Sequence, residues 1–153
     1  MILGATPEMV VELEVPARAE FVALARMVVA TVASSRRDLP ADRVDDLRLA
    51  VSEACTNAIE AHRAAAVDEP VFVRIWEDDD RLDVCVQDHG KGFDPDTLPT
   101  HPPVTDPERL NFERGLGIPL MRSLVDDVVF RPSPSGTEVY ITIRGGRRRN
   151  RAH

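Results

Sequence analysis

The sequence predicts an α+β fold, a two-layer α/β sandwich in which helices cover one face of a mostly antiparallel, mixed sheet. Segments with strand alternation follow one another closely, as in hairpins, whereas the two longest segments with helical periodicity come in one block. No GxGxxG turn follows the first strand and no GxxxxGK(S/T) loop occurs, which disfavours a doubly wound parallel sheet.

The first predicted elements are a strand and a helix. Residues 10–15 alternate apolar and charged side chains, which predicts a half-buried strand. Pro16 suits the first turn of a helix, because its missing N–H would have no partner there. This helix breaks at residues 34–40, and its expected apolar stripe consists of Phe21, Leu24, Val28 and Val32.

A second, longer helix is predicted from Asp42, a good N-cap, to about Ala66. Glu53 and Asn57 lie one turn apart, near the side opposite the expected core face. Their neighbours on that side are apolar rather than charged, so we expect this side to be covered, for example by a bound ligand. The expected core face, with Ile59 at its margin, consists of Val44, Leu47, Val51, Ala54, Cys55 and Ala58.

The remaining elements alternate between hairpins and one helix. Two strands separated by a short acidic turn predict a hairpin, and the second strand leads directly into an Asp-His-Gly-Lys-Gly segment. A long loop without periodicity follows. In chain order, the predicted elements are strands at 71–77 and 82–88, a loop at 94–114, a helix at 115–125, and closing strands at 128–131 and 138–144.

Size and composition are those of one soluble domain, which we place at residues 1–146, followed by a basic, flexible tail at 147–153. The net charge of −7 disfavours general affinity for nucleic acid. No apolar run is long enough to cross a membrane, and no signal peptide is recognisable. We expect Cys55 and Cys85 to be buried, reduced thiols, which indicates a cytoplasmic protein.

Glu53 and Asn57 are the first candidates for chemistry. The amide oxygen of Asn57 suits a hard cation such as Mg²⁺. The carboxylate of Glu53 could orient or deprotonate a hydroxyl or a water. Taken alone, the pair fits a solvent-facing or hydrogen-bonded polar pair at least as well.

Two glycine turns are the next candidates. Asp88 ends a strand, where its carboxylate could accept a hydrogen bond from an exocyclic amine such as that of adenine, and Gly90 and Gly92 would let the backbone approach a flat base. Gly115 and Gly117 precede a helix start, where free N–H groups favour phosphate. Each turn alone is more often structural. In this order, together with the polar pair, they indicate an ATP site.

The chain resembles the Bergerat-type ATPases, the superfamily of gyrase and histidine kinases, and within it the anti-sigma-factor serine kinases of bacterial stress and sporulation switches. The matching segments are AVSEACTNAIEAH at 50–62, VQDHGKGFD at 86–94, ERGLGIPLMRSLVDDV at 113–128 and SGTEVYITI at 135–143. The resemblance implies the Bergerat ATP-binding fold, with ATP and Mg²⁺ as ligands.

The resemblance also implies roles for individual residues. It makes Glu53 the general base for a serine hydroxyl, Asn57 the magnesium ligand and Asp88 the adenine-binding aspartate. It places Arg26 at the partner protein and makes residues 95–114 a mobile lid. The other residues implied at the nucleotide are Gly90, Gly92, Arg114, Gly115, Leu116, Gly117 and Thr137.

One position departs from the family pattern. Family members commonly carry a His four residues after the metal-binding Asn, but here Ala61 occupies that position and His62 follows it. We expect His62 to cap the end of the helix and His89 to be exposed to solvent.

The resemblance implies an ATP-dependent serine-protein kinase that acts as an anti-sigma factor. It would phosphorylate a small anti-anti-sigma antagonist, sequester a sigma factor and form a homodimer, without contacting nucleic acid or membrane directly. The alternative is an ATP-binding regulatory module with little or no kinase activity. A detached catalytic domain of a sensor histidine kinase is disfavoured, because no helical hairpin with a phosphoacceptor His precedes the domain.

Overall fold

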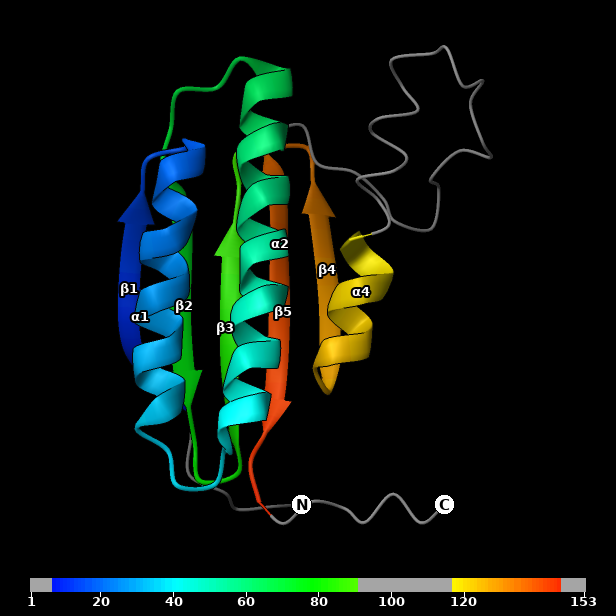
Figure 1. Ribbon diagram of the computed structural model, residues 1–153. Coiled ribbons are helices and arrows are strands. Elements are labelled where there is room, and N and C mark those ends of the chain that lie inside the picture. Colours follow the sequence, from blue (N-terminus) through cyan, green and yellow to red (C-terminus); the bar gives the residue numbers. More distant parts are fainter. Residues whose placement is uncertain (1–6, 91–116, 147–153) are drawn as a thin grey trace.

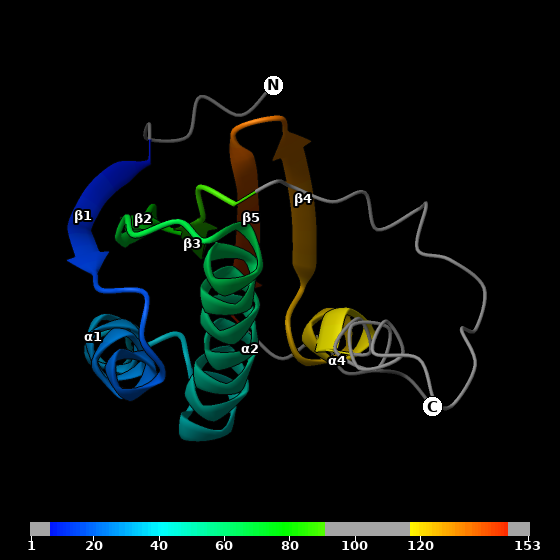
Figure 2. The same cartoon turned by 90° about the horizontal axis from the view of Figure 1, so that it is seen from above.

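The computed structural model describes residues 7–90 and 117–146. It contains a five-stranded sheet in the order β1-β2-β3-β5-β4, and all four strand pairs within the described ranges are antiparallel. The three α-helices of the described ranges lie on one face of this sheet (Figure 1), and a view along the layers separates helices from strands (Figure 2). The predicted two-layer α+β architecture is thereby confirmed.

The strands agree with the predicted segments to within a few residues. Their alternating burial reflects one covered face and one open face. The hairpin β2–β3 turns through Asp78, whose carboxylate accepts hydrogen bonds from the backbone N–H groups of Asp80 and Arg81. The strands are β1 (Glu8–Val15), β2 (Val71–Glu77), β3 (Arg81–Gln87), β4 (Asp127–Ser133) and β5 (Gly136–Arg144).

The first helix begins later than predicted, and its most buried positions lie one residue further along the chain than the expected stripe. The N–H of Arg18 donates to the carbonyl of Pro16 in a tight turn, after which come a 3₁₀ turn, η1 (Ala19–Phe21), and the helix α1 (Val22–Ser34). The fully buried positions are Ala25, Val29 and Ala33, whereas Leu24 is exposed. Of the expected stripe, Phe21, Val28 and Val32 are partly buried and pack against the core, so the prediction was wrong for Leu24 alone.

The second helix, α2 (Ala41–Ala65), is the central element. Pro40 occupies its N-cap position, so the prediction of Asp42 as the cap was wrong and Asp42 lies in the first turn. The helix ends where Ala66 adopts a left-handed conformation with φ 54°. Its predicted core face is buried as expected, and Ile59 is buried with it.

The third helix, α4 (Gly117–Leu124), packs along α2. Arg43, near the start of α2, donates to the carbonyl of Leu124 at the end of α4 and pairs with Asp126 at 2.8 Å. The other end of α4, Gly117, lies against Glu53, further along α2. The two helices are therefore antiparallel, and α4 presents its N-terminus to the middle of α2.

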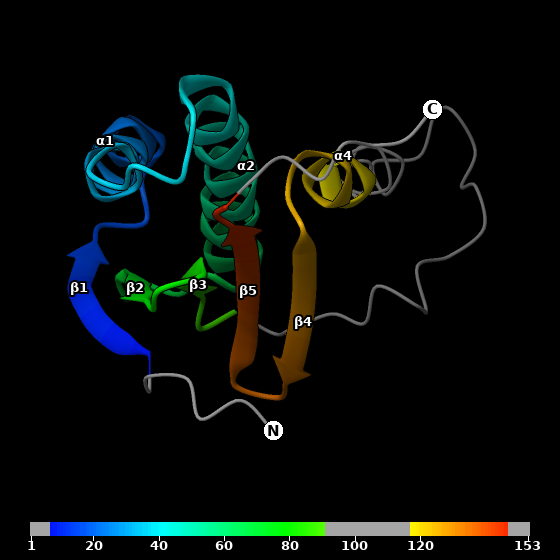
Figure 3. The same ribbon diagram turned by 90° about the horizontal axis from the view of Figure 1, so that it is seen from below.

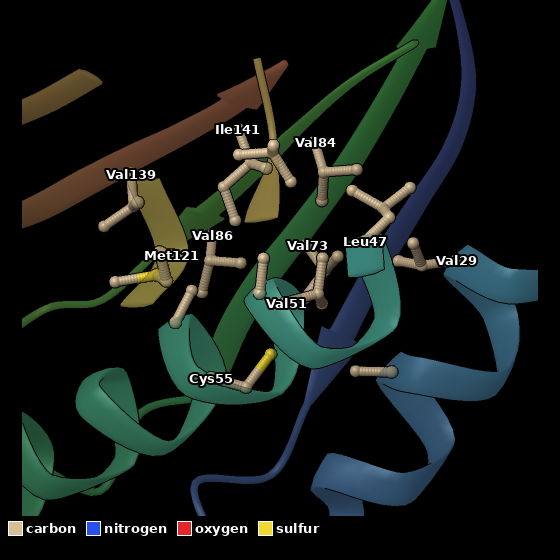
Figure 4. Close-up of a cluster of buried hydrophobic side chains, with 14 of the residues drawn as sticks. Val29, Leu47, Val51, Cys55, Val73, Val84, Val86, Met121, Val139 and Ile141 are labelled. Atoms are coloured by element: carbon tan, nitrogen blue, oxygen red, sulfur yellow. The ribbon is translucent and has the colours of Figure 1, made fainter. Parts of the chain in front are cut away.

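The core lies between the helices and the sheet (Figure 4). Leu47 and Val51 of α2 meet Val73, Val84 and Ile141 from three neighbouring strands, and all five are 0% exposed. Burying a side chain of this kind contributes about 1.5–3 kcal/mol. This layer fixes the height of α2 above the sheet, and with it the position of the residues on the other side of α2.

The opposite face of the sheet has no helix over it in the described ranges, as Figure 3 also shows. Arg74 pairs with Glu12 and Gln87 there, and Trp76 stacks on Tyr140 with ring centroids 6.3 Å apart.

Cys55 and Cys85 are buried and free, which confirms the prediction of two buried thiols without a disulfide. Burial raises the pKa of the Cys55 thiol to about 12 and that of Cys85 to about 11.

Several predictions fall on other parts of the chain. The loop at 94–114, its role as a lid and the tail at 147–153 lie outside the described residues. Among the helices that are described, none combines the length and the apolar character required to traverse a bilayer.

Candidate functional site

One stripe of α2 touches both ends of the candidate site. Glu53, Asn57 and Ala61 are spaced four residues apart, so they lie one above another along the helix. Glu53 and Asn57 are half-buried, on a side of α2 away from the core layer. The stripe from Glu53 to Ala61 is about 12 Å long, at about 1.5 Å per residue.

The second glycine turn meets this stripe at Glu53. A Cβ atom added to Gly117 would lie 2.6 Å from the Oε2 atom of Glu53. Real side chains do not approach so closely, so only glycine leaves the carboxylate its observed place beside the first residue of α4. The carboxylate therefore lies at the N-terminus of α4, where backbone N–H groups also face outward.

The first glycine turn meets the stripe one turn beyond Asn57. A Cβ atom on Gly90 would lie 2.9 Å from both the Cβ and the carbonyl oxygen of Ala61. The structure thus brings Gly90 and Gly117, which are distant in sequence, to the same side of one helix. Asn57 lies between them on this side of the helix.

Asp88 anchors the first turn. It is 6% exposed, and its Oδ1 atom accepts hydrogen bonds from the N–H groups of Gly90 at 2.9 Å and Thr137 at 3.2 Å. Burial raises the pKa of this carboxyl above its usual range, and the two N–H donors oppose that shift. Both of these described donors bind Oδ1, so the hydrogen bonds of this carboxylate within residues 7–90 and 117–146 leave Oδ2 out.

Thr137 completes this corner of the site. Its backbone carbonyl accepts a hydrogen bond from the N–H of Asp88 at 3.0 Å, and its side chain is 2% exposed. No partner among the described residues reaches its buried Oγ1 atom. A buried hydroxyl without a partner is costly, so a ligand or a water that binds it would be favoured.

Gly136 also lies at the candidate site, although no sequence motif predicted it there. Its φ of 138° suits glycine alone, and a Cβ atom there would collide with the backbone carbonyl of Asp88. This close approach lets β5 begin directly against the Asp88 turn. A Ser-Gly pair ahead of a strand was the available signal, but it reads equally well as an ordinary turn.

The predictions for His62 and His89 were wrong. His62 does not cap α2: it is 1% exposed, and its ring nitrogens face the carbonyl of Glu69 and the N–H of His89. The His89 ring is partly covered and packs edge-on against Phe72, with centroids 5.4 Å apart. Neither contact has a local sequence signal, because the partners come from different elements.

The other predicted residues are placed as follows. Arg26 is half-buried on α1, where it lines a shallow groove with Met27 and Arg48. The helix α1 lies on the side of α2 away from α4 (Figure 2). Arg26 therefore does not join the stripe described above. Four predicted site residues lie outside the described ranges: Gly92, Arg114, Gly115 and Leu116.

A two-layer domain whose central helix holds a carboxylate and an amide between two glycine turns defines the class of histidine kinase-like ATPase domains. The profile of that domain family matches residues 15–143. Within the class, the chain belongs to the family of the serine-protein kinase RsbW. It is 38% identical to RsbW of Bacillus subtilis (strain 168) over 136 residues, which cover 86% of this chain and 83% of that protein.

Two further comparisons agree. RsbW of Bacillus licheniformis is 37% identical over 123 residues, which cover 77% of this chain and 75% of that protein. The crystal structure of the RsbU and RsbW domains of Rv1364c from Mycobacterium tuberculosis superposes with a TM-score of 0.66 over 94% of this chain, at 17% identity. This chain spans 33% of that larger protein, so this comparison bears on the fold alone.

Proposed function

We propose that the protein is an ATP-dependent serine-protein kinase and anti-sigma factor. It phosphorylates a small anti-anti-sigma antagonist and, in a separate complex, sequesters a sigma factor. The observation that carries the proposal is the stripe on α2, where Glu53 and Asn57 lie between Gly117 and Gly90. The names of the relatives, which are serine-protein kinases, support the same conclusion.

In this proposal the adenine binds at the Asp88 corner. The exocyclic amine donates to the Oδ2 atom of Asp88, while Oδ1 holds the turn through Gly90 and Thr137. The unpartnered Oγ1 of Thr137 is available to a ring nitrogen, directly or through a water. Because Gly90 lies directly against Ala61, the backbone of this turn stays close to α2 and leaves space for the base.

The residues present fit a magnesium ion beside the phosphates. Asn57 offers a neutral oxygen ligand midway between the two turns, and Mg²⁺ in such sites is held by few protein ligands together with phosphate oxygens. When bound, the ion neutralises charge on the triphosphate. The phosphates extend toward Gly117, with Arg114, Gly115 and Leu116 as further contacts and residues 95–114 as the lid.

Glu53 acts as the general base. The serine Oγ of the antagonist attacks the γ-phosphorus, the bond from that phosphorus to the bridging oxygen of ADP breaks, and the hydroxyl proton passes to Glu53. The products are phosphoserine and ADP, and the proton then leaves Glu53 for solvent. Gly117 keeps the carboxylate in place by leaving space for it at the start of α4.

The partner surface is a separate part of the proposal. Arg26 on α1 contacts the partner protein, from a helix that lies beside α2 and away from α4 (Figure 2). The active form is a homodimer. The alternative function, an ATP-binding regulatory module without significant transfer, is favoured by one observation: Ala61 stands where family members carry a His, and it contacts Gly90 directly.

The test uses labelled ATP and a panel of small antagonist proteins. We expect the wild-type protein to label a serine of one antagonist and Glu53→Gln to bind ATP but transfer little.

A second experiment tests the metal ligand. Asn57→Ala should lose magnesium-dependent ATP binding in calorimetry while its circular dichroism is unchanged. Binding of ATP without transfer to any antagonist would favour the regulatory module, and unchanged affinity in Asn57→Ala would remove the metal assignment.

A further inference from the structure

We propose that His62 is a positioning residue for nucleotide recognition: it holds the backbone of the Asp88–Gly90 turn and thereby sets the place of the Asp88 carboxylate. This inference rests on the proposed function, because it assumes that Asp88 binds adenine. It adds a residue that lies outside the glycine turns and touches no nucleotide itself.

The position of His62 gives it two fixed hydrogen bonds. It lies in the last turn of α2 and is 1% exposed. Its Nδ1 atom is 2.9 Å from the carbonyl oxygen of Glu69, and its Nε2 atom is 2.7 Å from the backbone nitrogen of His89. Both neighbours are backbone groups, so each can play only one role in a hydrogen bond.

These neighbours determine the state of the imidazole. A carbonyl oxygen only accepts, so Nδ1 must carry the hydrogen, and an amide N–H only donates, so Nε2 must offer a lone pair. Only the neutral ring with hydrogen on Nδ1 satisfies both. His62 is therefore an acceptor for the N–H of the residue that lies between Asp88 and Gly90.

The turn has attachments on both sides, and His62 supplies one of them. On the β5 side, Asp88 exchanges hydrogen bonds with Thr137 through its backbone N–H and its Oδ1 atom. On the α2 side, Gly90 rests against Ala61, and the N–H of His89 is held by His62. Among the described contacts, the α2 side would without His62 retain only the steric contact of Gly90 with Ala61, and the turn could shift relative to the helix.

The side chain of His89 packs at the same place, between the end of α2 and the Asp88–Gly90 turn. Its ring lies edge-on to Phe72 of β2 and to His62, with centroids 5.4 Å and 6.0 Å away, and its Nδ1 atom is 3.7 Å from the carboxylate of Glu69. The last turn of α2, the segment before β2 and the end of β3 therefore converge on one point. A substitution that disturbs this contact between His62 and His89 is expected to displace Asp88 and to leave the core between α2 and the sheet in place.

Two substitutions divide the functions of the ring. In His62→Asn the amide nitrogen can reach the place of Nδ1 and donate to Glu69, but nothing accepts from His89. In His62→Gln the amide oxygen can reach the place of Nε2 and accept from His89, but the donor to Glu69 is lost. The pair is matched in chemistry, and each member removes one of the two hydrogen bonds.

We expect His62→Gln to bind ATP within about threefold of the wild type, and His62→Asn to bind it about tenfold more weakly, a difference of about 1.4 kcal/mol. Preference for ATP over GTP should fall in the Asn variant alone. Calorimetry gives both affinities, and thermal denaturation of each variant verifies that it is folded at the temperature used. A purely structural histidine would lower the melting temperature in both variants without separating their ATP affinities.

Nitrogen NMR of the wild-type protein tests the same inference without a substitution. The ring of His62 should show the tautomer with hydrogen on Nδ1, and addition of ATP should shift both its Nε2 resonance and the backbone amide of His89. The inference is overturned if the other tautomer is found, if ATP leaves these resonances unchanged, or if the Asn and Gln variants bind ATP equally well. Absence of ATP binding in the wild type would instead remove the proposed function, and this inference with it.

Discussion

At the scale of single residues, the most informative group is the carboxyl of Asp88. A carboxylate that is 6% exposed is unfavourable for stability unless its oxygens are paired, and the described donors reach only Oδ1. Burial accordingly raises its pKa. A residue that lowers stability in the free protein is expected at a place where a ligand completes the hydrogen bonding.

The first prediction concerns nucleotide selectivity. Asp88→Asn keeps an oxygen for the N–H groups of Gly90 and Thr137, but it places an NH₂ group where the exocyclic amine of adenine would donate. We expect ATP affinity to fall by about 1.5–3 kcal/mol, the value of a hydrogen bond to a charged group, with a much smaller effect on GTP. Calorimetry measures both, and equal losses for ATP and GTP would contradict the assignment.

The second prediction concerns pH. Folding raises the pKa of the Asp88 carboxyl above its unfolded value, so the folded state favours the protonated form. The contribution of protonated Asp88 to the free energy of unfolding is therefore fully present in acid and is lost as pH rises through the folded-state pKa. Asp88→Asn is neutral throughout and escapes this loss. Its melting temperature without ligand should therefore exceed that of the wild type at neutral pH, and the difference should shrink toward acid. A lower melting temperature at neutral pH would argue against an uncompensated charge.

At the scale of elements, α2 organises the site by its two glycine contacts. Gly117 faces the end of a flexible side chain, Glu53, whereas Gly90 faces the backbone of Ala61. Although both glycines leave less than 3.0 Å for a Cβ atom, the neighbours differ in how easily they can move. The same substitution should therefore mainly affect activity at Gly117 and mainly affect stability at Gly90.

The third prediction follows from this contrast. Gly117→Ala should displace the Glu53 carboxylate with little loss of stability and reduce phosphoryl transfer about tenfold or more, because misplacing a reacting group by about 1 Å can cost about 10²-fold. Gly90→Ala should instead lower the free energy of unfolding by about 1–3 kcal/mol, as overpacking does. Transfer assays and chemical denaturation of both variants measure the two effects. Similar losses of stability at both positions would show that Glu53 cannot move aside.

At the scale of the whole molecule, Arg36 ties together segments that are distant in the chain. Its guanidinium binds the carboxylate of Asp38 with two hydrogen bonds of 2.9 and 2.8 Å, and it also donates to backbone carbonyls of the β2–β3 turn at Asp78, Asp79 and Arg81. The side chain is 10% exposed. This cluster closes the end of the domain opposite Asp88, where the α1–α2 connection meets the hairpin.

The fourth prediction concerns this cluster. The hydrogen bonds from Arg36 lower the pKa of the Asp38 carboxyl, so the stability they contribute is present above the ordinary pKa of about 4 and is lost as pH falls through the folded-state value. Arg36→Gln should lower the free energy of unfolding by about 2–3 kcal/mol at neutral pH and by less in acid. Denaturation of both proteins at each pH tests this. An equal loss at both pH values would show that packing, not the charge pair, carries the effect.

The order of elements could be predicted from the sequence, whereas the chemistry of the site stays a prediction. Alternation in β2, β3 and β5 and the long periodicity of α2 depend on local burial, which leaves a regular pattern of residue types. The identity and spacing of the carboxylate, the amide and the glycines also predict an ATP site. That Glu53 and Asn57 face away from the core followed from helical geometry alone.

Only the tertiary structure decided which parts of the chain meet. The contacts of Gly117 with Glu53, of Gly90 with Ala61 and of His62 with His89 join residues from different elements, and a local pattern contains no such distances. The full burial of Ala25, Val29 and Ala33 on α1 depends on packing between elements for the same reason. Period and residue type are properties of a segment, whereas proximity depends on how all the segments pack together.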